Sequence, residues 1–154
     1  MFGTIYSQIG TIVLIAAFAF ALWKGDAAER VGGGLNLAAG LFAMFLHPLL
    51  SPDIQPVALL GVDAALAAGF LFLAIRFASL WLGAAMMLQA VQFSLHAYYM
   101  VAEIPHNLLF ARINNIDTLG IVIAIVGGTA VSWRRRVRKR RLEAQKAAAA
   151  ASEG

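Results

Sequence analysis

The sequence contains no cysteine, and charged residues occupy only 13% of its 154 positions. Without cysteine, the chain cannot form disulfide bonds, thiolate metal sites or a cysteine nucleophile. Hydrophobic residues make up 61% of the chain, which is more than a soluble domain of this size can bury. This composition predicts an integral membrane protein.

Charge is also missing at the amino terminus, where Met1 to Gln8 contains no Lys or Arg. A cleaved signal peptide carries basic residues ahead of its apolar stretch. We therefore expect the first apolar run to persist as a helix. The sequence also has no recognisable nucleophile or cofactor motif and no segment for a soluble domain, so we do not expect an enzyme.

Five apolar segments are each long enough to cross a bilayer, since about 20 helical residues span about 30 Å of hydrocarbon. They cover residues 4–23, 31–49, 56–76, 80–101 and 116–133. The connectors are a charged loop from Lys24 to Arg30, a turn at residues 51–53, a tight reversal at residues 77–79 and a polar segment at residues 106–115. The predicted fold is an all-α polytopic transmembrane helical bundle with a basic, Ala-rich tail at residues 134–154.

The basic residues of the tail predict the orientation of the chain. They are Arg134, Arg135, Arg136, Arg138, Lys139, Arg140 and Arg141. Lys and Arg accumulate in cytoplasmic loops, and a cytoplasmic tail also places Lys24, Arg30 and Arg76 inside, with Arg112 as the exception. We expect an N-out, C-in topology, with the tail against anionic lipid headgroups. Nucleic-acid binding is not expected, because no aromatic residues interleave the cluster.

Small residues recur every fourth position in two predicted spans. The first series is Gly61, Ala65 and Gly69; the second is Gly120, Ala124, Gly128 and Ser132. Small side chains let membrane helices approach closely. We interpret both series as packing surfaces within the bundle, with oligomerisation as the alternative.

The fourth predicted span carries a polar stripe, made of Gln89, Gln92, His96, Tyr99 and Glu103. Spacings of three and four place these residues on one helix face, and polar residues in a span normally face the bundle interior. Asp63 and His96 each lie about 10 Å below the outer end of their helix, so the two side chains could meet. In the second span, Asn36 and His47 share a face.

Three interpretations of this polar cluster remain open. The side chains could satisfy one another by interhelical hydrogen bonds that fix the helix register. Alternatively, Asp63 could be an intramembrane acid that works with His96 and Glu103 in a proton or cation relay. A third possibility is a b-type haem held between His47 and His96. No cofactor or metal is predicted from the sequence otherwise.

Several short segments resemble those of small membrane proteins of alphaproteobacteria. They are Trp23-Lys24-Gly25, Glu29-Arg30, Ile75-Arg76 and Leu80-Trp81, together with Gln89. This resemblance implies a location in the bacterial inner membrane and assigns no functional residue, because the group has no established activity.

The leading functional hypothesis is a non-enzymatic accessory or scaffolding subunit of a larger membrane complex. It rests on short loops and on the two small-residue faces, which suit protein partners in the membrane or a homo-oligomer. The alternatives are a small transporter or proton-conducting protein and a membrane haem-binding protein.

Overall fold

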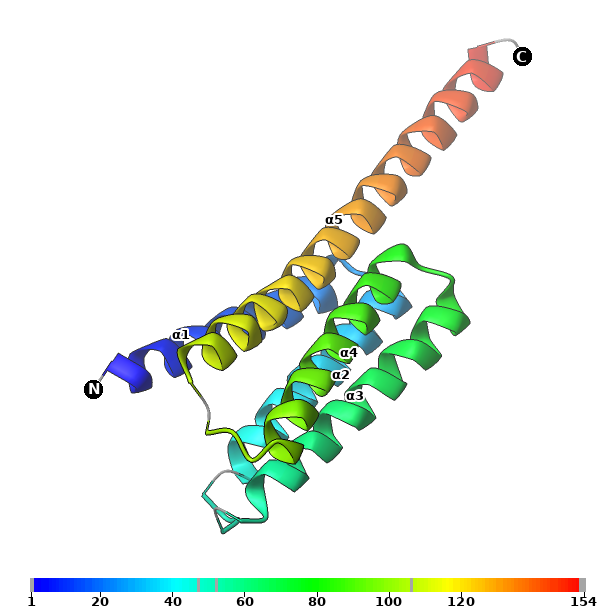
Figure 1. Ribbon diagram of the computed structural model, residues 1–154. Coiled ribbons are helices and arrows are strands. Elements are labelled where there is room, and N and C mark those ends of the chain that lie inside the picture. Colours follow the sequence, from blue (N-terminus) through cyan, green and yellow to red (C-terminus); the bar gives the residue numbers. More distant parts are fainter. Residues whose placement is uncertain (1, 47, 52, 106, 153–154) are drawn as a thin grey trace.

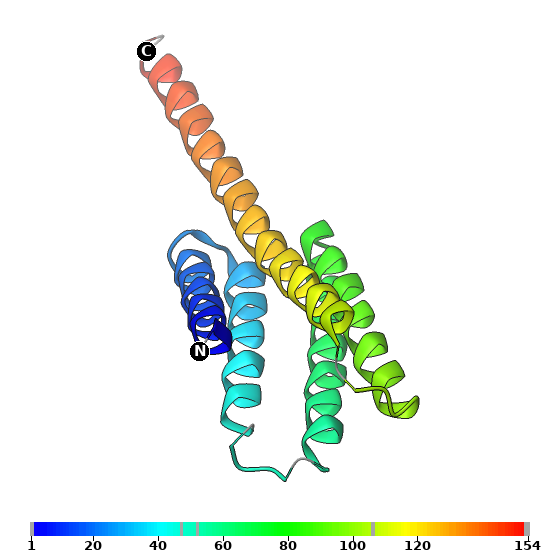
Figure 2. The same ribbon diagram turned by 60° about the vertical axis from the view of Figure 1, so that its left-hand side comes forward.

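A computed structural model of the chain describes residues 2–46, 48–51, 53–105 and 107–152, and its regular structure there is all α-helical. The five helices are α1 (Phe2–Lys24), α2 (Ala27–Leu46), α3 (Gln55–Phe77), α4 (Leu80–Val101) and α5 (Leu108–Ser152). They run up and down, so consecutive helices are antiparallel (Figures 1 and 2).

The connections define two ends of the bundle. The turns between α1 and α2 and between α3 and α4 lie at one end, from which the last part of α5 projects away from the other helices (Figure 1). We call this the basic end, because Lys24, Arg30 and the basic run of α5 gather there. The connections after α2 and after α4 lie at the opposite end, which we call the loop end (Figure 2).

The helix α4 has the bounds expected from sequence, but α2 begins earlier than its predicted span. The segment expected as a charged loop reduces to Gly25 and Asp26, and α2 starts at Ala27 and ends at Leu46. Glu29 therefore lies in the first helical turn, where a negative charge is favourable beside unpaired backbone N–H groups. Between α3 and α4, Ala78 adopts a left-handed conformation (φ 47°) that allows the tight reversal.

The polar connector expected at residues 106–115 is wrong from Leu108 onward, because α5 starts there and continues to Ser152. One polar residue of its first turns has a partner inside the bundle, because Gln92 Nε2 donates to Asn114 Oδ1 at 3.1 Å. The basic run and the Ala-rich tail are part of the same helix. Residues 134–141 therefore present their cations in several directions around a helix axis.

The core of the bundle combines large apolar side chains with close helix contacts at small residues. Leu66, Phe70, Leu82, Ile121 and Ile125 are among its buried members. A Cβ atom on Gly128 would lie 2.4 Å from Trp81 Cδ1, so α5 can approach α4 this closely only at a glycine. Gly120 similarly packs against Leu88, which confirms the interpretation of the second small-residue series as intramolecular packing.

Two helices, α3 and α5, are long and apolar enough to cross a membrane, and Ile9–Lys24 is a shorter apolar helical segment among the described residues. The expectation of five spans is therefore met only in part. Charged and amide side chains lower the hydropathy of α2 and α4; α2 carries Glu29 and Arg30, and α4 carries Gln89 and Gln92.

Candidate functional site

The centre of the candidate site is Asp63, which is 8% exposed on α3. His96 of α4 contacts one of its carboxylate oxygens through Nδ1, and Gln89 Nε2 donates to the other at 3.1 Å. Gln89 and His96 are seven residues apart, or about two helical turns, so both lie on the face of α4 that meets α3. The contact between Asp63 and His96 expected from the helix register is thus present.

Two cavities meet at this pair of side chains. His96, Tyr99 and Glu103 line a cavity of about 410 Å³ at the loop end of α3 and α4. Asp63 and Gln89 line a second cavity of about 150 Å³ in the bundle interior. Each member of the pair lines one cavity, so the Asp63–His96 contact lies between them.

The lining of the interior cavity is mostly apolar but includes several polar side chains. Asn36 of α2, which is 8% exposed, and Gln92 of α4 also line it, as does Thr118 of α5. Amide and hydroxyl groups can donate or accept hydrogen bonds in either direction. The cavity therefore offers a carboxylate and neutral polar groups to a small hydrogen-bonding guest such as water.

An apolar layer lies between this cavity and the basic end. Phe70 and Leu82 are fully buried and Ile125 is 1% exposed. Each of the three lies nearer the basic end than the site residues on its own helix. The layer separates the Asp63 site from a second buried carboxylate, Glu29, which is 2% exposed.

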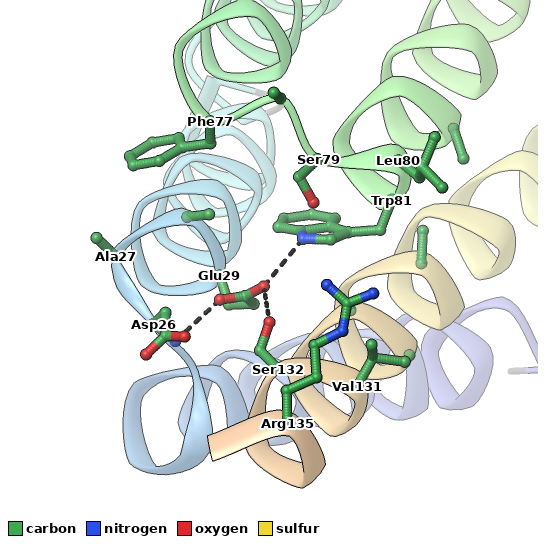
Figure 3. A pocket seen from close by; sticks show the side chains of 16 residues that line it. Asp26, Ala27, Glu29, Phe77, Ser79, Leu80, Trp81, Val131, Ser132 and Arg135 are labelled. Atoms are coloured by element: carbon green, nitrogen blue, oxygen red, sulfur yellow. Dashed lines mark hydrogen bonds between the residues drawn. The ribbon is translucent and has the colours of Figure 1, made fainter. Parts of the chain in front are cut away.

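Glu29 is held by groups from α4, α5 and the turn before α2 (Figure 3). Its Oε1 accepts hydrogen bonds from Trp81 Nε1 at 3.1 Å and from Ser132 Oγ at 2.7 Å, and its Oε2 accepts from the backbone N–H of Asp26 at 2.9 Å. These residues line a cavity of about 720 Å³ at the basic end, along which Arg135 also extends. Glu29 therefore ties three helices together at a cavity wall.

The remaining residues of the predicted stripe do not all belong to the Asp63 site. Tyr99 is buried, and its hydroxyl donates to Asn107 Oδ1 at 2.9 Å, which links the end of α4 to the start of α5. Glu103 lies beyond the end of α4 with φ 53° and is exposed, so it does not continue the helix face as expected. His47 lies outside the described residues.

Two functional candidates were not predicted from the sequence. Asp117 of α5 is 5% exposed, and its Oδ2 has no hydrogen-bond partner in the part of the chain that the structure describes. Asp117 is the second residue of the predicted span 116–133, and a charged residue at the end of a span is expected to be exposed. Glu29 was assigned to a loop because charged neighbours surround it, and no periodic signal marks it as buried.

The basic residues of α5 differ in their surroundings. The Arg136 guanidinium donates to the Asp26 carboxylate and to the backbone carbonyls of Lys24 and Gly25. Lys139 lies 3.9 Å from Glu143 in an exposed pair one helical turn apart. Arg136 thus fastens α5 to the turn between α1 and α2, whereas an exposed pair of this kind contributes little.

Within the described ranges, no group of three or more His, Asp or Glu side chains is arranged to hold a metal ion. No protein-family model, curated protein or solved structure matches the chain. Inferences about function therefore rest on the chemistry of the site.

Proposed function

We propose that the protein is a multi-pass helical membrane protein that transfers protons, alone or coupled to a solute, through the Asp63–His96 pair. The observation that carries this proposal is the partly buried contact of Asp63 with His96 between two cavities. Ionisable side chains are expensive inside a membrane bundle and mark ion pathways and proton relays there.

The distribution of polar and apolar side chains supports the membrane location. Asp63, Gln89 and Asp117 are buried, whereas large apolar side chains such as Phe72, Ile75 and Leu80 are exposed. A water-soluble protein rarely exposes so large an apolar surface, but the hydrocarbon of a bilayer is a suitable solvent for it.

The chemistry of the pair suits stepwise proton movement. A proton taken up by the second ring nitrogen of His96 makes the imidazole cationic, and the proton on Nδ1 can then pass to the Asp63 carboxylate. The imidazole returns to its neutral form and Asp63 becomes a neutral acid. Gln89 donates to the other oxygen of Asp63, so it holds the carboxylate in place without competing for the proton.

The apolar layer of Phe70, Leu82 and Ile125 favours a gated carrier mechanism rather than an open pore. The layer closes the interior cavity toward the basic end, so protons would enter and leave Asp63 from the loop end. Release at the opposite side requires a rearrangement of the helices, and such alternating exposure of one central site is how many carriers work.

The test is proton flux into liposomes that contain the purified protein and a trapped pH-sensitive dye. After an external acid pulse under a membrane potential, the unaltered protein should acidify the interior faster than empty liposomes. Asp63→Asn removes the titrating group but keeps the size of the side chain, and it should reduce the rate to that of empty liposomes. His96→Gln, which keeps a hydrogen-bond donor toward Asp63, should also slow acidification.

Asp53→Asn is the matched control, because it makes the same chemical change at an exposed residue in the connection between α2 and α3. It should leave the flux unchanged. Helical circular dichroism and the elution volume in detergent show whether each variant is folded. Flux by a folded Asp63→Asn variant at the unaltered rate would show that proton transfer does not use this site.

The accessory-subunit hypothesis has support from a different part of the molecule. An apolar groove between α2 and α3 is lined by Phe42, Ala58 and Gly61, and no atom lies within 4 Å of a Cβ built on Gly61. The first small-residue series therefore packs within the chain only in part: Gly69 contacts Leu35, whereas Gly61 is open to a neighbour. A protein without flux that copurifies with another membrane protein would favour this second function.

A further inference from the structure

A compact basic pocket lies at the basic end, between the end of α1 and the middle of α5. It has a volume of about 260 Å³ and is lined by Trp23, Lys24, Arg30, Trp133, Arg136, Val137 and Arg140. Four of these residues are cations, two are tryptophans, and none is a carboxylate. The pocket is separate from the Asp63 site and from the cavity at Glu29.

The cations of this pocket are positioned by the fold. Arg136 is bonded to the backbone carbonyls of Lys24 and Gly25, and Arg30 Nε donates to Gly25 O at 3.2 Å. Lys24 Nζ lies 3.9 Å from the ring centroid of Trp23 and 5.0 Å from that of Trp133. A ligand would therefore meet an arranged set of donors and lose less entropy on binding than it would on a flexible basic tail.

Because α5 continues as a helix through the basic run, only some of its basic residues line the pocket. Trp133, Arg136 and Arg140 are three and four residues apart, so they share one helix face, which turns toward α1. Arg134 and Arg141 belong to the same basic run but do not line the pocket. Asp26 accepts from Arg136, so an excess of positive charge remains among Lys24, Arg30 and Arg140.

The ligand that suits this chemistry is a phosphate group at a membrane surface. Guanidinium groups bind phosphate oxygens through paired hydrogen bonds, and indole rings favour the headgroup level of a bilayer. Basic pockets between helices on the cytoplasmic side of membrane proteins bind anionic headgroups. We propose that this pocket binds the headgroup phosphate of one anionic phospholipid, whose acyl chains lie against the exposed apolar surface of the bundle.

This inference rests on the membrane location proposed above and not on proton transfer. The probe is an equimolar mixture of a phosphatidylglycerol and a phosphatidylcholine with identical acyl chains, added to the full chain in mild detergent. Native mass spectrometry then counts the lipids retained. We expect one phosphatidylglycerol to be retained in preference to phosphatidylcholine, and millimolar inorganic phosphate should not displace it.

The variant Arg30→Gln/Arg140→Gln removes two cations that line the pocket. It should weaken phosphatidylglycerol retention about thirtyfold, which corresponds to about 1 kcal/mol for each cation. The single variant Arg140→Gln leaves the bonds of the turn between α1 and α2 in place and should weaken retention about fivefold. The matched control is Arg134→Gln/Arg141→Gln, which removes the same charge outside the pocket and should retain the lipid.

Two outcomes would overturn lipid binding at this pocket. Equal losses in the pocket variant and in the matched control would overturn the proposal in favour of diffuse charge attraction. Displacement by inorganic phosphate would identify a free anion as the ligand instead of a lipid. Asp63→Asn should keep the lipid, so failed proton flux and failed lipid binding are distinguishable.

Discussion

At the scale of single residues, Glu29 shows how hydrogen bonds hold a buried carboxylate that forms no ion pair with any residue the structure describes. Trp81, Ser132 and the N–H of Asp26 donate to its two oxygens, and its position in the first turn of α2 adds a favourable helix dipole. Burying a charge is costly unless hydrogen bonds satisfy it. The three donors come from separate parts of the chain, so Glu29 couples their positions.

This arrangement predicts the effect of Ser132→Ala. The substitution removes the donor 2.7 Å from Glu29 Oε1 with little change in volume, and a hydrogen bond to a charged group contributes about 1.5–3 kcal/mol. We expect a loss of that size in the free energy of unfolding in mixed detergent micelles. Ser94→Ala is the control, because the Ser94 hydroxyl donates to Ala90 O of its own helix at an exposed position. Equal losses in both variants would show that Glu29 does not depend on Ser132.

Part of the candidate site was predictable from the sequence and part was not. The contact between Asp63 and His96 was predictable, because equal depth in neighbouring helices follows from helix rise alone. Glu29 and Asp117 were not, because burial of a charged residue near a span end depends on tertiary partners that no local pattern records. For Glu29, two of those partners, Trp81 and Ser132, are distant in sequence.

At the scale of helices, the pairing of α4 with α5 depends on a glycine. Gly128 lies under the Trp81 ring, whose indole N–H is bonded to Glu29, so the ring cannot swing away freely. Gly128→Ala places a Cβ atom 2.4 Å from Trp81 Cδ1, and overpacking typically costs about 1–3 kcal/mol. We expect such a loss in detergent unfolding.

The neighbouring glycine provides the control for this prediction. A Cβ atom on Gly127 meets no atom within 4 Å, so Gly127→Ala should be neutral, or should stabilise α5 through the higher helix propensity of alanine. If the two substitutions had the same effect, the close approach of α4 and α5 at Gly128 would be wrong.

The bounds of the helices were predicted unevenly. The limits of α4 were correct because Ser79 and the residues after Val101 interrupt the apolar pattern on both sides. The start of α5 was wrong because Asn114, Asn115 and Asp117 resemble a polar loop, although their helix places Asn114 against Gln92.

At the scale of the whole molecule, the two ends of the bundle are chemically different. Lys24, Arg30 and the basic run of α5 at residues 134–141 gather at the basic end, whereas the connection between α2 and α3 has Asp53 and no basic residue among its described positions. Arg112, near the start of α5, is the exception at the loop end. Basic residues are retained on the cytoplasmic side of membrane proteins. The up-and-down path therefore predicts that the basic end is cytoplasmic and that the loop end faces the opposite compartment.

The absence of cysteine allows a direct measurement of this orientation, since every introduced thiol is the only one in the chain. Asp53→Cys and Ala102→Cys, both at exposed positions of the loop end, should react with a membrane-impermeant maleimide in intact spheroplasts. Ala78→Cys and Ala148→Cys, exposed at the basic end and on the projecting part of α5, should react only after the membrane is permeabilised. Because α3 alone separates Asp53 from Ala78, opposite labelling at these two positions requires that α3 cross the membrane. Equal labelling at both would remove the membrane-spanning role of α3, and with it the placement of Asp63 within a bilayer on which proton transfer depends.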